Sequence, residues 1–423
     1  MRRLDAFITT THTRAWKHFD VERTGHNLLQ TICQSIDDQR DTLIDTLAAH
    51  IAIPTGHNHT VGVAEYREQL LRRLRAIGAT IERRDGAPRP DWLLGTDPDA
   101  PIPATTVCRH AAPGKPRILL VGHLDTVFPP DGPFQHMTIA DDGKTAIGPG
   151  VVDMKGGILI AVTALEALHA AGVEIDWTYV LNEDEEVGSF ASVHVLAEEA
   201  RKADVGLVTE PALPGGELAI ERKGSGQFRI DVHGRSAHAG RAFFDGCSAV
   251  YALGEILSKL EAMSDADRGV TVNVGPIVGG DATNVVPDHA VAWGNVRFPD
   301  QESADELGRI MDALKTPDDA MPRVTVRRDF NRPAKPRTEA VDRLAGIARS
   351  VATDLGQELP FASTGGVCDG NVLQNAGLPT IDTLGVRGGG LHTTDEWIEL
   401  DSLTERAKLM ACLLVQLTEV WDE

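Results

Sequence analysis

A run of four apolar residues at positions 118–121, ILLV, constrains the fold more than any other stretch of the chain. A short run without polar alternation is typical of a strand buried on both faces, and such strands belong to parallel sheets covered by helices. An apolar helix expected over residues 158–168 and a strand at 177–182 continue the alternation of strand and helix. This order predicts an α/β protein with a mainly parallel sheet.

Two helices are expected before this strand. Apolar residues recur at helical spacing over 27–51, where Pro54 stops the helix, and over 64–77, where Gly78 is an end signal. A strand at 79–85 and a Pro-rich loop at 87–103 follow. Residues 1–25 are polar and aperiodic, so we expect an extension of no evident function.

The pattern changes near residue 221. From there to 332 the chain reads strand, helix, two strands, helix and strand, the order of a small ferredoxin-like α+β sandwich. The chain then returns to alternating helix and strand, so this segment is expected to be an insertion. With 423 residues, two domains are the natural expectation. We predict one domain built from residues 1–220 and 333–423, and a second, inserted domain at 221–332.

Composition narrows the possible partners and location. The chain has 41 Lys and Arg against 62 Asp and Glu, and a net charge of −21 disfavours nucleic acid or an anionic membrane as a partner. No apolar run reaches the roughly 18 residues of a membrane span, and the N-terminus lacks the apolar core of a signal peptide. The five cysteines are dispersed, which favours free thiols in a reducing compartment. We therefore expect a cytoplasmic protein.

Polar side chains with metal-binding chemistry follow three of the predicted strands. Because strand ends gather at one edge of an open α/β sheet, where ligands bind, these residues are expected to lie close together. They are His123, Asp125, Glu185, Glu186 and Glu210.

Two further candidates lie in Gly-rich turns. Asp153 stands in GPGVVDMKGG, where the glycines allow a tight bend, and His392 stands in GGGLHTTDE. Taken singly, each candidate has an ordinary explanation as a polar strand end, a solvated acidic turn or a loop histidine. Taken together they predict a site for a pair of metal ions. Zinc suits a mixed set of imidazole and carboxylate ligands, and cobalt or manganese would also fit.

The spacing suggests roles for two pairs. His123 and Asp125 share one face of a strand, so Asp125 can fix the ring nitrogen of His123 that does not hold metal. Glu185 and Glu186 are adjacent at a strand end and point in different directions. One of them can bind metal while the other faces the bound water as general base.

These motifs, in this order, resemble the co-catalytic zinc aminoacylase/carboxypeptidase family, which includes acetylornithine deacetylase, succinyl-diaminopimelate desuccinylase, aminoacylase and bacterial glutamate carboxypeptidase. The matching stretches are GHLDTV, GPGVVDMKGG, NEDEEVGS, VTEP, HGRSAHAG, GGDATNVVP and GGLHTTDE. The resemblance implies two zinc ions per chain, the first on His123 and Glu210, the second on Glu186 and His392, with Asp153 bridging. It also implies that Glu185 is the general base and Asp125 the outer partner of His123.

The same resemblance assigns the insertion to a lid that carries a homodimer contact. It implies that His238 of SAHAG reaches the active site of the partner subunit and stabilises the oxyanion. Asn284 and Arg297 match residues that line the substrate pocket, and Arg332 matches an arginine near the second hinge. An anionic intermediate needs donors beside the metals, and a substrate carboxylate needs an arginine fork, here Arg297, Arg332 or Arg387.

The sequence thus predicts a dinuclear zinc hydrolase that cleaves an amide bond beside a free carboxylate. Two substrate classes stay open. The stretch VFPPDGPF after the HxD motif favours a glutamate-carboxypeptidase-like peptidase acting on a small peptide or folate-like conjugate. The alternative is an N-acyl-amino-acid deacylase of the acetylornithine deacetylase type. A lesser alternative is a non-catalytic metal-binding scaffold, against which the presence of Glu185 counts.

Overall fold

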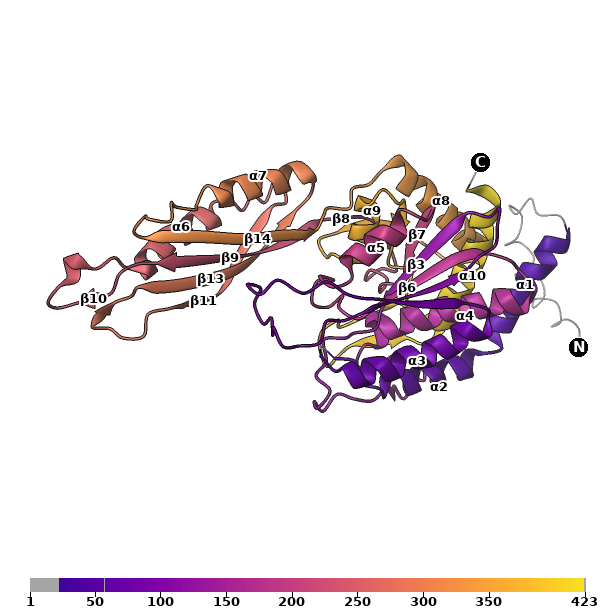
Figure 1. The fold of residues 1–423 in the computed structure, drawn as a ribbon. Coiled ribbons are helices and arrows are strands. Elements are labelled where there is room, and N and C mark those ends of the chain that lie inside the picture. The colour runs from indigo at the N-terminus through magenta and orange to yellow at the C-terminus, as the bar shows by residue number, and fades with distance from the viewer. Residues whose placement is uncertain (1–22, 57, 422–423) are drawn as a thin grey trace, which may run out of the picture.

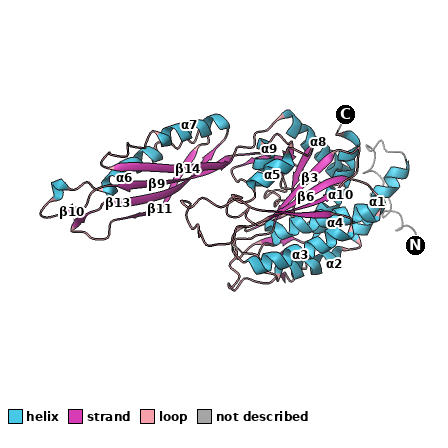
Figure 2. Cartoon of the chain, viewed as in Figure 1, coloured by secondary structure: helices cyan, strands magenta, loops and turns pink. Residues whose placement is uncertain are grey.

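The molecule consists of a helix-covered sheet and an elongated second sheet that extends away from it (Figure 1). The structure is a computed structural model that describes residues 23–56 and 58–421. The expected N-terminal extension at residues 1–25 falls almost entirely outside the described residues. Figure 2 shows that helices flank the first sheet on both faces and cover only one face of the second.

The first sheet has six strands in the order β1-β2-β6-β3-β7-β16. Strands β6, β3, β7 and β16 run parallel, while β1 and β2 are antiparallel additions at one edge. The prediction of an α/β fold with a mainly parallel sheet is confirmed. Strand β2 was not predicted, because its TTVCRH sequence has no long apolar run. The strands are β1 (Thr80–Arg84), β2 (Thr105–His110), β3 (Arg117–His123), β6 (Asp176–Asn182), β7 (Val205–Val208) and β16 (Thr380–Ile381).

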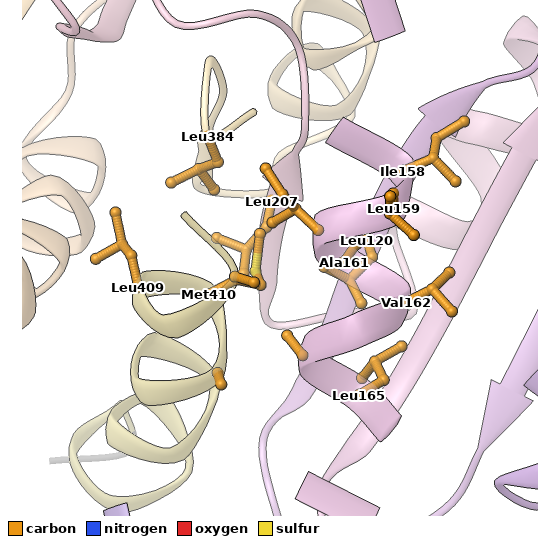
Figure 3. Close-up of a cluster of buried hydrophobic side chains, with 14 of the residues drawn as sticks. Leu120, Ile158, Leu159, Ala161, Val162, Leu165, Leu207, Leu384, Leu409 and Met410 are labelled. Atoms are coloured by element: carbon orange, nitrogen blue, oxygen red, sulfur yellow. The ribbon is translucent and has the colours of Figure 1, made fainter. Parts of the chain in front are cut away.

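Alternate residues of β3 pack into two different apolar cores on opposite faces of the sheet. Ile118 and Leu120 join the larger core, built with helices α3 (Thr60–Ala76), α4 (Gly156–Ala170), α8 (Glu339–Asp354) and α10 (Asp401–Val420). Leu119 and Val121 point to the opposite face, where α5 (Val193–Ala200) and α9 (Asp369–Asn375) pack. Helices α4 and α10 pack against each other, and Figure 3 shows Ala161 of α4 and Met410 of α10 in the core that they share. This packing supports the sheet edge from which the candidate site residues emerge.

The N-terminal helix predicted over 27–51 is two helices, so that prediction is wrong in detail. Helix α1 (Arg23–Asp37) ends at a turn, and α2 (Arg40–Ile51) begins after Gln39. The interruption carries Asp37 and Asp38, and Asp is a weak helix former because its carboxylate competes for backbone N–H groups. Apolar periodicity continues across the break and conceals it.

The second sheet is antiparallel, with the order β11-β13-β9-β14. Its chain order, with a helix after the first and third strands, is that of a ferredoxin-like sandwich, as predicted. Both helices pack on one face over a separate apolar core. The elements are β9 (Gly224–His233), α6 (Ala249–Glu261), β11 (Thr271–Gly279), β13 (His289–Phe298), α7 (Gln301–Asp312) and β14 (Arg323–Arg332).

Small strands complete the structure. In a sheet ordered β17-β18-β5-β4, residues that flank His392 pair with residues just before the bend at Asp153. Strands β10 and β12 form an antiparallel pair, and β10 lies at the far end of the second sheet (Figure 1). These strands are β4 (Thr138–Ile139), β5 (Thr145–Ile147), β8 (Leu218–Arg222), β10 (Ala237–His238), β12 (Val285–Val286), β15 (Phe361–Thr364), β17 (Gly388–Gly389) and β18 (Trp397–Glu399). Within the described ranges, every helix is too short or too polar to cross a bilayer.

Candidate metal centre

Four of the predicted residues converge around a fifth, Asp153. Its Oδ1 lies 3.1 Å from His123 Nε2 at the end of β3, and its Oδ2 lies 3.5 Å from His392 Nε2. His392 Nε2 is 3.3 Å from Glu186 Oε2, and His123 Nε2 is 4.0 Å from Glu210 Oε1. The two carboxylate oxygens of Asp153 therefore face one imidazole each, so this residue stands between two groups of potential ligands.

The bend that presents Asp153 depends on close backbone approaches. Gly150 has a φ of 71°, which favours glycine, and it precedes the irregular segment Val151–Lys155. At Gly157 a Cβ atom would lie 1.9 Å from the carbonyl oxygen of Thr209, so only glycine lets α4 start this close to the chain beside Glu210. The glycines of GPGVVDMKGG thus bring Asp153 and Glu210 together.

Glu396 stabilises the same bend through hydrogen bonds to its backbone. Its carboxylate accepts hydrogen bonds from the backbone N–H groups of Gly150 (3.1 Å), Val152 (2.8 Å) and Asp153 (3.1 Å). Glu396 itself is fully buried. The sequence motif GGLHTTDE ends at Glu396 but does not predict this role for it. Its contacts join residues more than 240 positions apart, and only the fold brings them together.

Asp125 fixes two neighbours at once. The ring Nδ1 of His123 is 2.9 Å from the backbone carbonyl oxygen of Asp125 and 3.5 Å from its carboxylate. That carboxylate accepts hydrogen bonds from the backbone N–H groups of Glu185 (3.2 Å) and Glu186 (3.0 Å). The residue therefore orients His123 mainly through its main chain, and positions the two glutamates through its side chain.

The electrostatics of the cluster suit cations. Burial raises the pKa of Glu186 to about 7 and raises that of Glu210 well above its usual range. Burial would lower the pKa of His123, but its bonds to Asp125 and Asp153 outweigh this and raise the pKa. Hydrogen bonds to Asp153 and Glu186 raise the pKa of His392 to about 10. Burial would raise the pKa of Asp153, but its hydrogen bonds with His123 and His392 outweigh this and lower the pKa. Two carboxylates and two imidazoles thus retain protons that a bound dication would replace.

The donor set passes a direct test of fit to metal. Potential ligand atoms of His123, Asp153 and Glu186 lie within 4.8 Å of one another. Glu210 Oε1 is buried and has no hydrogen-bond partner within residues 23–56 and 58–421, and such an atom is costly unless something binds it. Imidazole and carboxylate donors are those that zinc and related ions use.

Glu185 lies next to this cluster and is bonded to Arg332. Arg332 Nη2 donates to Glu185 Oε1 over 2.7 Å, and Nη1 donates to Asp369 Oδ1 over 2.8 Å. Asp369 also accepts from Asn182 Nδ2 (2.7 Å) and Ser189 Oγ (2.6 Å). Burial raises the pKa of Glu185 while Arg332 opposes the rise. The sequence did not predict a role for Asp369. Its only local signal is its position in a GxxCDG stretch.

The three arginines predicted to bind a substrate carboxylate differ in their surroundings. Arg332 is 3% exposed and already serves Glu185 and Asp369. Arg387 is paired with Glu399 and Glu405, each at 2.7 Å. Arg297 has a buried Nη1 with no hydrogen-bond partner in the part of the chain that the structure describes. Arg297 is therefore the guanidinium best placed to accept an anion.

His238 and Asn284 lie apart from the metal centre of their own chain. They lie together at the antiparallel pair of β10 and β12, where the Ala239 N–H donates to the Asn284 carbonyl over 2.9 Å. Strand β10 is at the end of the second sheet farthest from the first sheet (Figure 1). The roles predicted for these two residues at an active site stay predictions.

Comparison with known proteins finds a peptidase family and related hydrolases. A family profile described as Peptidase family M20/M25/M40 matches residues 119–416. Carboxypeptidase G2 of Pseudomonas sp. (strain RS-16) is 28% identical over 393 residues, covering 91% of each chain. Succinyl-diaminopimelate desuccinylase of Sphingopyxis alaskensis is 28% identical over 375 residues, covering 85% of this chain and 94% of that protein.

Solved structures share the fold. A tripeptidase from Staphylococcus aureus superposes with a TM-score of 0.72 at 20% identity, covering 89% of this chain and 98% of its own. The Bacillus subtilis YXEP protein, described as a dinuclear metal-binding peptidase from the M20 family, gives a TM-score of 0.64 at 16% identity, covering 91% and 99%.

The α/β fold and the cluster of imidazoles and carboxylates at its sheet edge define a metal-dependent hydrolase that acts on amide bonds. The family profile covers well over half of the chain. The protein belongs to peptidase family M20/M25/M40, so the predicted family resemblance is confirmed.

Proposed function

We propose that this protein is a dinuclear zinc hydrolase that removes a C-terminal residue bearing a free carboxylate, in the manner of a glutamate carboxypeptidase. The observation that carries the proposal is the combination of the five-residue cluster with a base, Glu185, and with Arg297, whose buried Nη1 has no hydrogen-bond partner among the described residues. His123 and Glu210 would hold one ion, Glu186 and His392 the other, and Asp153 would bridge them. Cobalt or manganese could replace zinc at such ligands.

The residues around the cluster have distinct tasks in this proposal. When bound, the ions polarise the scissile carbonyl and bring the pKa of water towards neutrality. Glu185 accepts the proton of the attacking water and delivers it to the leaving amine. Arg332 and the side chain of Asp125 hold Glu185 in place from two sides. A base held in one position avoids the loss of rate that a misplacement of about 1 Å would cause.

Arg297 would bind the carboxylate of the substrate. In the second sheet, Ser225 of β9 is paired with Arg297 of β13 on one side and with Arg332 of β14 on the other. Burial and the neighbouring charge of Arg332 lower the pKa of Arg297. Among the described residues Arg297 has no acidic partner, and β9 alone separates its strand from that of the arginine that supports Glu185. Such a guanidinium suits a bidentate bond to a carboxylate.

We further propose that residues 221–332 form a lid domain and that two chains pair through it. Strand β11 lies at an open edge of its sheet, and β-strand edges readily accept another strand. Several exposed apolar residues lie on this strand, on α6 and near the β10–β12 pair, namely Phe243, Phe244, Val250, Tyr251, Ile277, Val278 and Val285. Pairing there would let His238 serve as an oxyanion donor in the other chain.

The runner-up is deacylation of an N-acyl amino acid, because desuccinylases are among the relatives at similar identity. Both reactions place a carboxylate beside the scissile amide. Membership of a peptidase family, together with Glu185, counts against a non-catalytic scaffold. The five cysteines are free thiols, so we propose a reducing compartment such as the cytoplasm.

A substrate panel tests this proposal. The purified chain with added zinc would be given dipeptides, a benzoyl-glutamate conjugate, N-acetyl amino acids and N-succinyl amino acids. We expect the highest kcat/KM on the conjugates that release a free C-terminal glutamate, and a loss of that preference in Arg297→Ala. A higher kcat/KM on N-acetylornithine or N-succinyl substrates would favour the deacylase, and hydrolysis of none would contradict both.

A further inference from the structure

Two cysteines from opposite ends of the chain meet in the large apolar core. Cys33 lies on α1 and Cys412 on α10, and their Sγ atoms are 3.7 Å apart although 379 residues separate them in the sequence. Both residues are buried, and neither is in a disulfide. A disulfide needs about 2.05 Å between the sulfur atoms, so the two side chains must move closer for the bond to form.

We propose that Cys33 and Cys412 are a modification site at which a peroxide forms a reversible disulfide that fastens α1 to α10. Helix α1 otherwise rests on the core through a few side chains such as Leu29, Ile32 and Ile36. Helix α10 packs along α4, the helix that starts directly after the bend at Asp153. The disulfide would therefore join α1 to α10, which packs against the helix that follows the bend at Asp153.

Cys33 is the sulfur that an oxidant reaches first. It is 8% exposed, whereas Cys412 is fully buried. An open depression of about 890 Å³ adjoins Cys33 and is lined by α1, by Leu355 and by Lys408 of α10. A hydrogen bond with Cys412 and the charge of Lys408 lower the pKa of Cys33, while the same bond and burial raise that of Cys412. Thiolate character and access thus both favour Cys33 as the attacking group.

The chemistry balances with hydrogen peroxide as the oxidant. The Cys33 thiolate attacks one peroxide oxygen, the O–O bond breaks, and with one proton this gives a sulfenic acid and one water. The Cys412 thiol then attacks the Cys33 sulfur, the S–O bond breaks, and the hydroxyl leaves with the thiol proton as a second water. Two thiols lose two electrons in total, and one peroxide gains them. A dithiol reductant reverses the reaction by exchange.

Peptide mapping of the full-length, metal-loaded protein tests the proposal without any substitution. After brief exposure to hydrogen peroxide and alkylation, we expect a cross-linked pair of peptides containing Cys33 and Cys412, a mass loss of about 2 Da in that pair, and its disappearance on reduction. Cys247, the half-buried cysteine of the second sheet region, is the internal control because it has no sulfur neighbour among the described residues.

Variants sharpen the result. Cys33→Ser and Cys412→Ser should each abolish the cross-link, while Cys247→Ser should leave it intact. Amide hydrogen exchange over residues 27–37 should slow at least ~10-fold in the oxidised protein. The proposal fails if Cys247 becomes oxidised while Cys33 stays a thiol or proceeds to sulfinic acid without the cross-link. It also fails if the cross-link forms and exchange in α1 does not change.

Discussion

Arg332 and Glu185 form a buried ion pair of 2.7 Å that links the last strand of the second sheet to the loop beside the metal centre. The guanidinium is held in turn by Asp369, at 2.8 Å, which is the first residue of α9. Breaking one member of a buried pair leaves an uncompensated charge. The position of the base therefore depends on three parts of the chain that are distant in sequence.

Replacement of Arg332 should damage catalysis more than binding. We expect Arg332→Ala to lower kcat by about 10–100-fold with a smaller change in KM, because the base is displaced while the groups that hold the substrate remain. Arg332→Lys should recover part of the loss. Arg327→Ala is the matched control, since Arg327 lies on the same strand in an exposed pair of 3.6 Å with Asp91. Equal kcat in Arg332→Ala and Arg327→Ala would refute the positioning role.

Glu396 should matter for metal affinity. Its carboxylate receives three backbone N–H groups of the bend that carries Asp153. Because outer partners of metal ligands typically contribute 10–100-fold in affinity, we expect about that increase in Kd for zinc in Glu396→Gln. Calorimetric zinc titration of the apoprotein measures it. Glu399→Gln, three residues further on and half exposed, should bind zinc normally, and the same Kd in both variants would oppose this account.

His50 should make the protein less stable in mild acid. It is buried, and burial lowers its pKa to about 3 from an ordinary value of 6.5. Below pH 6.5, His50 binds a proton in the unfolded chain but stays neutral in the folded chain until the pH approaches 3. The free energy of unfolding therefore falls as the pH falls from 6.5 towards 3. On going from pH 7.5 to pH 5.5, His50 should lower the free energy of unfolding by about 1 kcal/mol.

Urea unfolding at these two pH values measures that cost. The decrease in the free energy of unfolding should be about 1 kcal/mol smaller in His50→Gln than in the unsubstituted protein. His169→Gln, which removes an exposed histidine at the end of α4, should show the full decrease. A decrease of equal size in all three proteins would exclude His50 as the cause.

Subunit sharing predicts recovery of activity on mixing. His238→Ala and Glu185→Ala chains should each be nearly inactive as homodimers. After random exchange, half of the dimers are mixed and each has one complete site, so about a quarter of the original activity should return. Mass spectrometry of intact dimers would verify the exchange. No recovery in verified mixed dimers would exclude a role for His238 across the dimer.

The sequence predicted the parts of the fold that depend on local pattern. The run at 118–121 indicated β3, and strand ends placed His123, Glu186 and Glu210 at one edge, where the structure brings them together. Residues whose importance comes from tertiary contacts were not predicted. Asp369 meets Arg332 and Ser189, and Glu396 meets the bend at Asp153, through bonds that no local spacing reveals.

The break between α1 and α2 was missed for a related reason. Leu43 and Leu47 continue the apolar stripe begun by Ile36, so periodicity alone reads one helix across the turn at Asp38. His238 lies far from the metal centre of its own chain because the second sheet is long. A short sequence motif contains no information about that distance.

The central claim is that His123, Asp153, Glu186, Glu210 and His392 hold two neighbouring cations. Anomalous diffraction from crystals grown with zinc tests it most directly. We predict two peaks, one beside His123 and Glu210 and one beside Glu186 and His392, with Asp153 contacting both. No ion beside His123 or His392, with the two histidines well separated, would contradict it.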